Sequence, residues 1–201
     1  MQNILFPISH FTSHISLLPH QIMPRISPLE TREQSTETQI AFIQHKTIYN
    51  SRITNAKATL GHSALAFKVY MQWYPLFEET KTILGARLAT LFALSISEAS
   101  QSDYSSAYFR KTIIDSGEDP EQLSVSDEEQ ILLNFGTAIA ENKGLVPDEI
   151  FKPIRKKYAN EEIVLFTAFA GIMIANNIFN NVIQTEIDEH LHSYIPQNHT
   201  V

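Results

Sequence analysis

Three hydroxyl side chains stand close together in the middle of the chain, where Ser102, Tyr104 and Ser105 fall within four residues. A serine hydroxyl becomes a nucleophile only when a base within hydrogen-bond reach takes its proton. No histidine lies nearby in the sequence, and the nearest carboxylates are Asp103 and, one helical turn before Ser102, Glu98. A serine paired only with a carboxylate makes a poor hydrolase. The residue types therefore favour a structural role, with Ser102 as the N-cap of a helix.

The composition excludes some kinds of chemistry. None of the 201 residues is a cysteine, so disulfides, thiolate metal sites and redox cycles of the protein's own sulfur are not available. The net charge of −7 argues against a nucleic-acid partner, because such binding needs a basic patch. We interpret the one small basic cluster as a solvated helix face near the C-terminal end of that helix; it contains Lys152, Arg155, Lys156 and Lys157.

Two groups of acidic and histidine residues have the composition of a metal site without its spacing. They are Glu186, Asp188, Glu189, His190 and His192 near one end, and His10, His14 and His20 near the other. His190 and His192 are two residues apart and would point to different sides of a helix, so we interpret their segment as a solvated tail. Prolines interrupt the other group. The sequence predicts neither a metal nor a cofactor.

The elements that must position the central hydroxyl groups are helices. Apolar residues recur every three to four positions between Lys81 and Ser100, which predicts a core helix there. A second helix is predicted over 102–116, ended by Gly117. Similar patterns predict further helices over 35–49, 63–77 (kinked or ended by Pro75), 126–142, from Pro147, and over 161–184. Because no stretch alternates with a period of two, the predicted fold class is all-α.

The chain length and its 43% hydrophobic content suit one domain with a real core. We predict a flexible N-terminal arm over 1–22, a helical domain over 23–190 and a C-terminal tail over 191–201. The most apolar run, 163–175, falls short of the roughly 20 residues that span a bilayer, so no membrane partner is predicted. The arm lacks the basic start of a secretory signal, which makes the cytoplasm the expected location.

Several segments share their pattern and order with one known superfamily. They are Met23-Pro-Arg-Ile-Ser-Pro-Leu, His62-Ser-Ala-Leu-Ala-Phe-Lys-Val-Tyr, Leu84-Gly-Ala-Arg-Leu-Ala-Thr-Leu-Phe-Ala-Leu, Ser126-Asp-Glu-Glu-Gln-Ile-Leu-Leu-Asn-Phe-Gly, Ile150-Phe-Lys-Pro-Ile-Arg-Lys-Lys-Tyr and the long stretch that begins at Ile163. Together they resemble the carboxymuconolactone decarboxylase and alkylhydroperoxidase D-like superfamily, in its peroxidase-related branch. The resemblance covers residues 23 to about 190 and implies an alkylhydroperoxidase D-like helical domain.

The resemblance also implies where a reactive site would lie. In the family's peroxidases, a Cys pair attacks a peroxide and resolves as a disulfide, assisted by an upstream Glu and by a His between or after the cysteines. The matching positions here hold Thr90 for the Glu, Ser102 and Ser105 for the cysteines, Tyr104 between them and Phe109 for the later His. Serine cannot undergo the reversible oxidation that the peroxidase cycle needs of sulfur. Thiol peroxidase activity is therefore not expected. The decarboxylase branch typically retains the His at the position where this chain has Phe109, so the resemblance does not imply lactone decarboxylase activity either.

Two further patterns concern the walls of such a site. Tyr104 and Tyr108 lie four residues apart and share a helix face, where they could line a pocket or join the core. Four asparagines interrupt the last apolar helix; one pair is free to face solvent, and a buried pair would need hydrogen-bond partners. The resemblance implies an interface or pocket-wall position for the buried pair, which we state as a hypothesis. The four are Asn176, Asn177, Asn180 and Asn181.

Three functions stay open from the sequence. The first is a degenerate member of the family without redox chemistry, acting as an oligomeric binding or scaffolding protein. The second is an enzyme with a remodelled acid–base pocket around Ser102, Tyr104, Ser105 and Glu98, acting on a small organic acid or lactone. The third is an antioxidant role inferred from the family alone. The resemblance implies a homo-oligomer, either a dimer, a trimer or a hexamer, and a small-molecule ligand stays open as a further partner.

Overall fold

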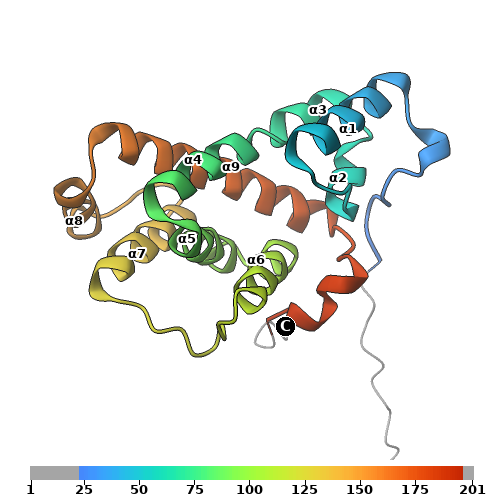
Figure 1. Ribbon diagram of the computed structural model, residues 1–201. Helices are drawn as coiled ribbons and strands as arrows, with labels where there is room; N and C mark the ends of the chain where they lie inside the picture. Colours follow the sequence, from blue (N-terminus) through green and yellow to red (C-terminus); the bar gives the residue numbers. More distant parts are fainter. Residues whose placement is uncertain (1–22, 197–201) are drawn as a thin grey trace, which may run out of the picture.

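The structure, a computed structural model, describes residues 23–196, and over this range it is built from helices without any strand. The α-helices are α1 Thr36–Tyr49, α2 Asn55–Leu60, α3 Ala64–Tyr70, α4 Trp73–Leu84, α5 Ala86–Ala99, α6 Asp103–Asp115, α7 Asp127–Glu141, α8 Asp148–Lys157 and α9 Asn160–Ile183 (Figure 1). Two 3₁₀ helices, η1 Thr31–Glu33 and η2 Glu189–Tyr194, complete the described chain. The all-α prediction is confirmed. The predicted arm over 1–22 lies outside the described residues.

Most predicted helices are present, but two boundaries were wrong. Pro75 does not kink a helix over 63–77; it lies in the first turn of α4, where a missing backbone N–H removes no hydrogen bond. The predicted helix from Lys81 to Ser100 is divided at Gly85, whose φ of 79° lies in the region that favours glycine. The chain turns there from α4 into α5. The short helix α2 had no sequence signal that we recognised.

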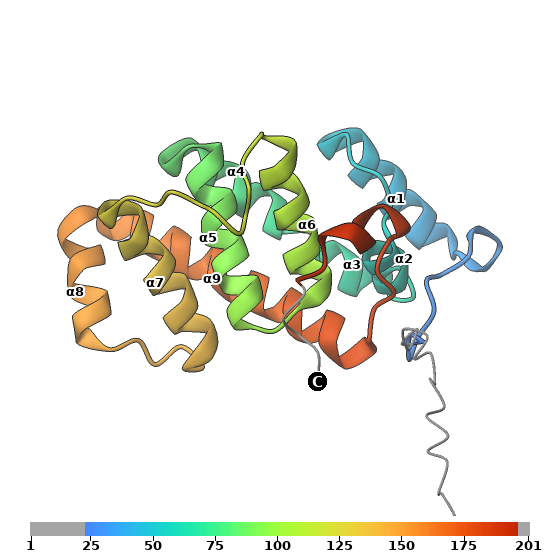
Figure 2. The same ribbon diagram turned by 90° about the horizontal axis from the view of Figure 1, so that it is seen from below.

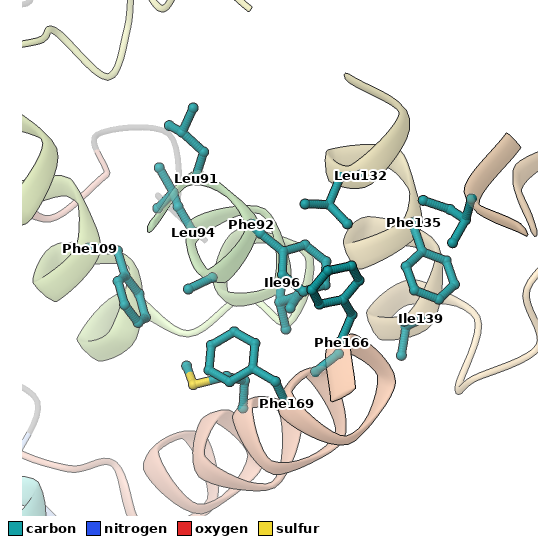
Figure 3. Packing of buried hydrophobic residues seen from close by; sticks show 14 of the residues in the cluster. Leu91, Phe92, Leu94, Ile96, Phe109, Leu132, Phe135, Ile139, Phe166 and Phe169 are labelled. Carbon is teal, nitrogen blue, oxygen red and sulfur yellow. The ribbon is translucent and has the colours of Figure 1, made fainter. Parts of the chain in front are cut away.

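The main core surrounds α5, which packs against α4, α6, α7 and α9. Figure 3 shows Phe92 of α5 beside Phe166 and Phe169 of α9, and all three side chains are fully buried. On the opposite helix, a Cβ at Gly136 of α7 would lie 2.7 Å from the Phe92 ring, so glycine permits this close approach. A second, smaller cluster joins α1, α2 and α3, and Trp73 packs against both clusters.

Helix α9 runs along the domain from α8 to the α1–α3 end (Figures 1 and 2). Its 24 residues are long and apolar enough to cross a membrane, and a third of its most apolar window is buried inside the fold. Phe166, Phe169 and Met173 belong to the main core. We therefore interpret α9 as a core helix with one outward apolar face.

The segment after α9 turns back and packs η2 against α6 (Figure 2). Leu191 is only 1% exposed. The interpretation of residues 186–192 as a solvated tail was therefore wrong, because an apolar anchor holds them on the domain. The predicted division at residue 191 falls inside η2.

A buried histidine gives the smaller cluster a pH dependence. His45 is 3% exposed and lies against the rings of Phe67 and Tyr74, and neither ring nitrogen has a hydrogen-bond partner. Burial, and then the charge of Lys57, lowers the pKa of His45 to about 4. Between pH 6.5 and 4 the unfolded chain takes up more protons than the folded one. The folded state is thus destabilised as the pH falls through this window.

We expect His45→Leu to remove most of this dependence. Urea unfolding of the native protein at pH 6.5 and pH 4 should show a loss of about 3 kcal/mol that the variant does not share. Equal losses in both proteins would show that His45 is not the responsible group.

Candidate functional site

A cavity of about 300 Å³ lies where the two hydrophobic clusters meet. The loop before α2, α2 itself and helices α4, α6 and α9 form its walls, together with η2. Its apolar lining comes from Leu60, Met71, Trp73, Phe109 and Met173. Its polar lining comes from Asn50, Ser51, Arg52, Thr54, Lys57, Tyr74, Tyr104, Ser105, Tyr108, Asn176, Asn180 and His190. The cavity thus combines apolar walls with a polar side rich in hydroxyl groups.

Three of the predicted site residues, Tyr104, Ser105 and Phe109, line this cavity. Ser102 lies just behind it: the side chain is buried, and its Oγ lies 3.5 Å from Ser105 Oγ. Ser102 is the N-cap residue of α6, but its hydroxyl makes no capping hydrogen bond. Thr90 lies on α5, where its hydroxyl donates to the Ala86 carbonyl oxygen.

Glu98 is not among the residues that line the cavity. Its side chain is 41% exposed, and one carboxylate oxygen lies 3.3 Å from the Arg110 guanidinium. Arg110 also pairs with Glu121. The carboxylate that the sequence offered as an acid–base group therefore belongs to a surface ion-pair network.

One asparagine pair does form part of the cavity wall. Asn176 donates to the Ile172 carbonyl oxygen within α9, and Asn180 Nδ2 lies 3.4 Å from Ser105 Oγ. The Asn180 amide oxygen is buried without a hydrogen-bond partner. Asn177 is fully buried, and neither of its amide atoms has a partner. Asn180, a residue that lines the cavity, thus has an unpaired buried acceptor.

Sequence reasoning missed the most unusual group in the cavity, the ammonium of Lys57. The residue is 7% exposed, and its Nζ donates to Ser51 Oγ at 2.7 Å, to the Arg52 carbonyl oxygen at 2.9 Å and to the Tyr74 hydroxyl at 2.8 Å. All three acceptors are uncharged. Burial, opposed by Asp188 and reinforced by Arg52, lowers the pKa of Lys57 to about 8. The signal in the sequence was only a lysine at a helical spacing among small and apolar residues.

The C-terminal segment contributes the other missed residues. Tyr104 donates its hydroxyl hydrogen to Asp188 at 2.6 Å, and the Asn55 backbone N–H donates to the same carboxylate at 3.2 Å. Burial and then Asp188 raise the pKa of Tyr104, which keeps it a hydroxyl donor. His190 hydrogen-bonds to Arg52, and burial and the neighbouring guanidinium lower the pKa of His190.

Comparison with known proteins gives a clear fold. No family model matches the chain, and neither does any curated protein sequence. Among solved structures, the debrominase Bmp8 without ligand has a TM-score of 0.68 at 16% identity, over 84% of this chain and 95% of that one. A Cys-to-Ala variant of Bmp8 in complex with 2,3,4-tribromopyrrole has a TM-score of 0.69 at 16% identity, over 87% of this chain and 97% of that one.

A peroxidase-related alkylhydroperoxidase D core protein from Ralstonia eutropha JMP134 has a TM-score of 0.59 at 12% identity, over 83% of this chain and 94% of that one. This chain has the alkylhydroperoxidase D-like fold. At these identities the likeness establishes the fold alone. The fold and the absence of cysteine agree with the predicted substitution of the thiol motif.

On this alkylhydroperoxidase D-like scaffold, the cavity is lined by two basic side chains, and the nearby carboxylate of Asp188 offsets their charge in part. These are Lys57 and Arg52, and among the described residues of the lining there is no aspartate or glutamate. Among the described residues, no group of three or more His, Cys, Asp or Glu side chains is arranged to hold a metal ion. The chemistry that the cavity supports is therefore recognition of negative charge, together with proton transfer among hydroxyl groups and one amine.

The lowered pKa of Lys57 predicts how stability varies at alkaline pH. Between pH 8 and pH 10.5 the unfolded chain binds more protons at this residue than the folded chain, so the native protein gains stability as the pH rises. Lys57→Met replaces the ammonium by an apolar side chain of similar length and removes this gain. Relative to the variant, we expect the native protein to gain about 3 kcal/mol across the window in urea unfolding.

The exposed Lys156→Met variant is the matched control, because its lysine lies on the surface of α8. Its unfolding free energy should follow that of the native protein across the same pH range. If the Lys57→Met curve also ran parallel to that of the native protein, the assignment of a lowered pKa to Lys57 would be wrong.

Proposed function

We propose that this protein is a non-redox binding protein for small organic anions, and that the anion lies in the cavity beside Lys57 and Arg52. The observation that carries this proposal is a buried ammonium in a cavity whose described lining residues include no carboxylate. A buried charge is costly unless it is paired. The lowered pKa of Lys57 expresses this cost, and an anionic ligand would offset it.

The remaining lining residues favour an anionic ligand whose other part is small, flat and apolar. Trp73 and Phe109 supply aromatic faces, and Met71 and Met173 supply flexible side chains that adapt to shape. The cavity volume of about 300 Å³ suits a ligand of one small ring. The structurally similar Bmp8 was crystallised with 2,3,4-tribromopyrrole, which is also a small ring. We therefore propose ring carboxylates, such as benzoate, as the ligand class.

Binding of ring carboxylates tests the proposal. Titration calorimetry with benzoate and 4-hydroxybenzoate should detect binding to the native protein. Lys57→Met should weaken binding at least ~10-fold, because hydrogen bonds to charged groups contribute about 1.5–3 kcal/mol. The Lys156→Met variant should bind like the native protein. Absence of binding, or equal weakening in both variants, would contradict the proposal.

We also propose that the functional form is a homo-oligomer in which α9 contacts a second copy. The outward face of α9 carries Val164, Ala168, Gly171, Ala175, Ile178 and Val182, spaced alternately by four and three residues. Val164, Ile178 and Val182 are each more than half exposed. No charged residue occurs between Ile163 and Ile183. A continuous uncharged stripe of this kind favours packing against another helix.

Light scattering after size-exclusion chromatography measures the molar mass of the particle and so tests for the homo-oligomer directly. We expect the native protein to have the mass of an oligomer, and Ile178→Lys to shift it toward the monomer because the charge would be buried at the contact. Leu145→Lys is the control, since Leu145 lies 80% exposed in the loop between α7 and α8. A native protein that is monomeric at all concentrations would exclude the oligomer.

A further inference from the structure

A serine, a lysine and a tyrosine form a closed triangle of hydrogen bonds on the cavity wall. Ser51 Oγ lies 2.7 Å from Lys57 Nζ and 2.9 Å from the Tyr74 hydroxyl oxygen, and the lysine and tyrosine atoms are 2.8 Å apart. All three residues line the cavity. Anion binding alone requires the lysine charge, but it does not require a serine hydroxyl held against the amine.

The local fold fixes this geometry. Asn50 ends α1 in the left-handed region at φ 46°, and the chain then runs through Ser51 to α2, which carries Lys57. The Arg52 carbonyl oxygen accepts the third hydrogen bond of the amine and so holds Nζ against its own loop. Tyr74 comes from the first turn of α4, on the other side of the amine. Two separate segments thus hold the three polar atoms in contact.

We propose that Ser51 is a nucleophile with Lys57 as its general base, and that the cavity hydrolyses esters of small ring carboxylic acids. This inference rests on the proposed function, because the acid released by hydrolysis is the anion that the cavity binds. A serine activated by a lysine is one of the known variants of serine nucleophiles. The reaction needs only the ester and water.

Each step balances in atoms and protons. Neutral Lys57 Nζ takes the Ser51 hydroxyl proton while Oγ forms a bond to the ester carbonyl carbon. The C–O bond to the alcohol then breaks, and the lysine ammonium returns its proton to the leaving oxygen. Water attacks the acyl-serine, gives one proton to Lys57 and releases the acid as Ser51 Oγ recovers that proton. During both additions, the Arg52 guanidinium and the Tyr74 hydroxyl are the donors that line the cavity for the negatively charged oxygen.

The charged and titratable neighbours of Lys57 set the pH at which its amine becomes neutral and can act as a base. The titratable and charged groups that face Lys57 are Arg52 on its own loop, Asp188 from the C-terminal segment, His45 from α1 and Tyr74 from α4. The low pKa of His45 keeps it uncharged at neutral pH, and burial raises the pKa of Tyr74 to about 12, so it remains a hydroxyl group. Lys57 therefore changes from acid to base near pH 8, before the neighbouring tyrosine ionises.

Hydrolysis of 4-nitrophenyl benzoate and labelling by a fluorophosphonate test the inference on the full chain. We expect kcat/KM to rise with pH and level off above about pH 8. Peptide mass spectrometry should locate the phosphonyl group on Ser51. Ser51→Ala and Lys57→Met should each lower kcat/KM by about 100-fold or more, and each should prevent labelling at position 51. Tyr74→Phe, which keeps the ring, should lower the rate by about 10-fold and move the pH midpoint downward, because the ammonium loses an acceptor.

Two variants outside the cavity control for unspecific ester cleavage. Ser95→Ala removes a hydroxyl that donates to the Phe92 carbonyl oxygen on α5, and Lys156→Met removes a surface amine. Both should hydrolyse the ester at the native rate. Turnover that survives Ser51→Ala, or label found on another residue, would overturn the inference. Benzoate binding without any ester hydrolysis would retain the proposed function and exclude the serine nucleophile. Hydrolysis through Ser51 without benzoate binding would exclude the proposed function alone.

Discussion

Complete burial of the middle of α5 is the constraint on which the arrangement of the fold depends. Phe92, Ala93 and Ile96 are fully enclosed, so helices must cover this element on every side. Four helices do so, and α9 is long enough to continue past the core toward the α1–α3 cluster. The two apolar clusters meet at Trp73 without merging. The cavity lies at this junction, where large rings from one cluster meet the loop and helix that carry Ser51 and Lys57.

Desolvation then gives the junction its chemical character. The amine of Lys57 is surrounded by neutral acceptors, and the carboxylate of Asp188 is held by Tyr104 and the start of α2. The positive charge is thus stabilised only in part, which is why its pKa falls. Burial with neutral acceptors destabilises the charged form of Lys57. The same surroundings suit the amine to bind a negative ligand or to transfer a proton. In an alkylhydroperoxidase D-like fold without cysteine, the described cavity lining still offers the amine of Lys57, several hydroxyl groups and the imidazole of His190.

The sequence predicted the fold class and most helices because apolar spacing and capping residues are local signals. Ser126 and Glu129, for example, form the reciprocal cap that their spacing indicated. The sequence also indicated the right part of α6, since Tyr104, Ser105 and Phe109 reach the cavity. It could not indicate that Ser51, Lys57, Tyr74 and His190 meet, because they come from three separate segments and only tertiary packing brings these together. Glu98 was misleading for the same reason: its distance from Ser102 along the chain did not reveal the competing partner Arg110.

The contact between η2 and α6 has a consequence for biosynthesis. Asp188 and His190 are translated after every helix that forms the remaining walls, yet one orients Tyr104 and the other lines the cavity. Domains tend to fold from the N-terminal side as they leave the ribosome. A nascent chain can therefore bury α5 before the η2 wall of the cavity is in place. Until η2 packs against α6, the amine of Lys57 would face an open groove instead of an enclosed cavity.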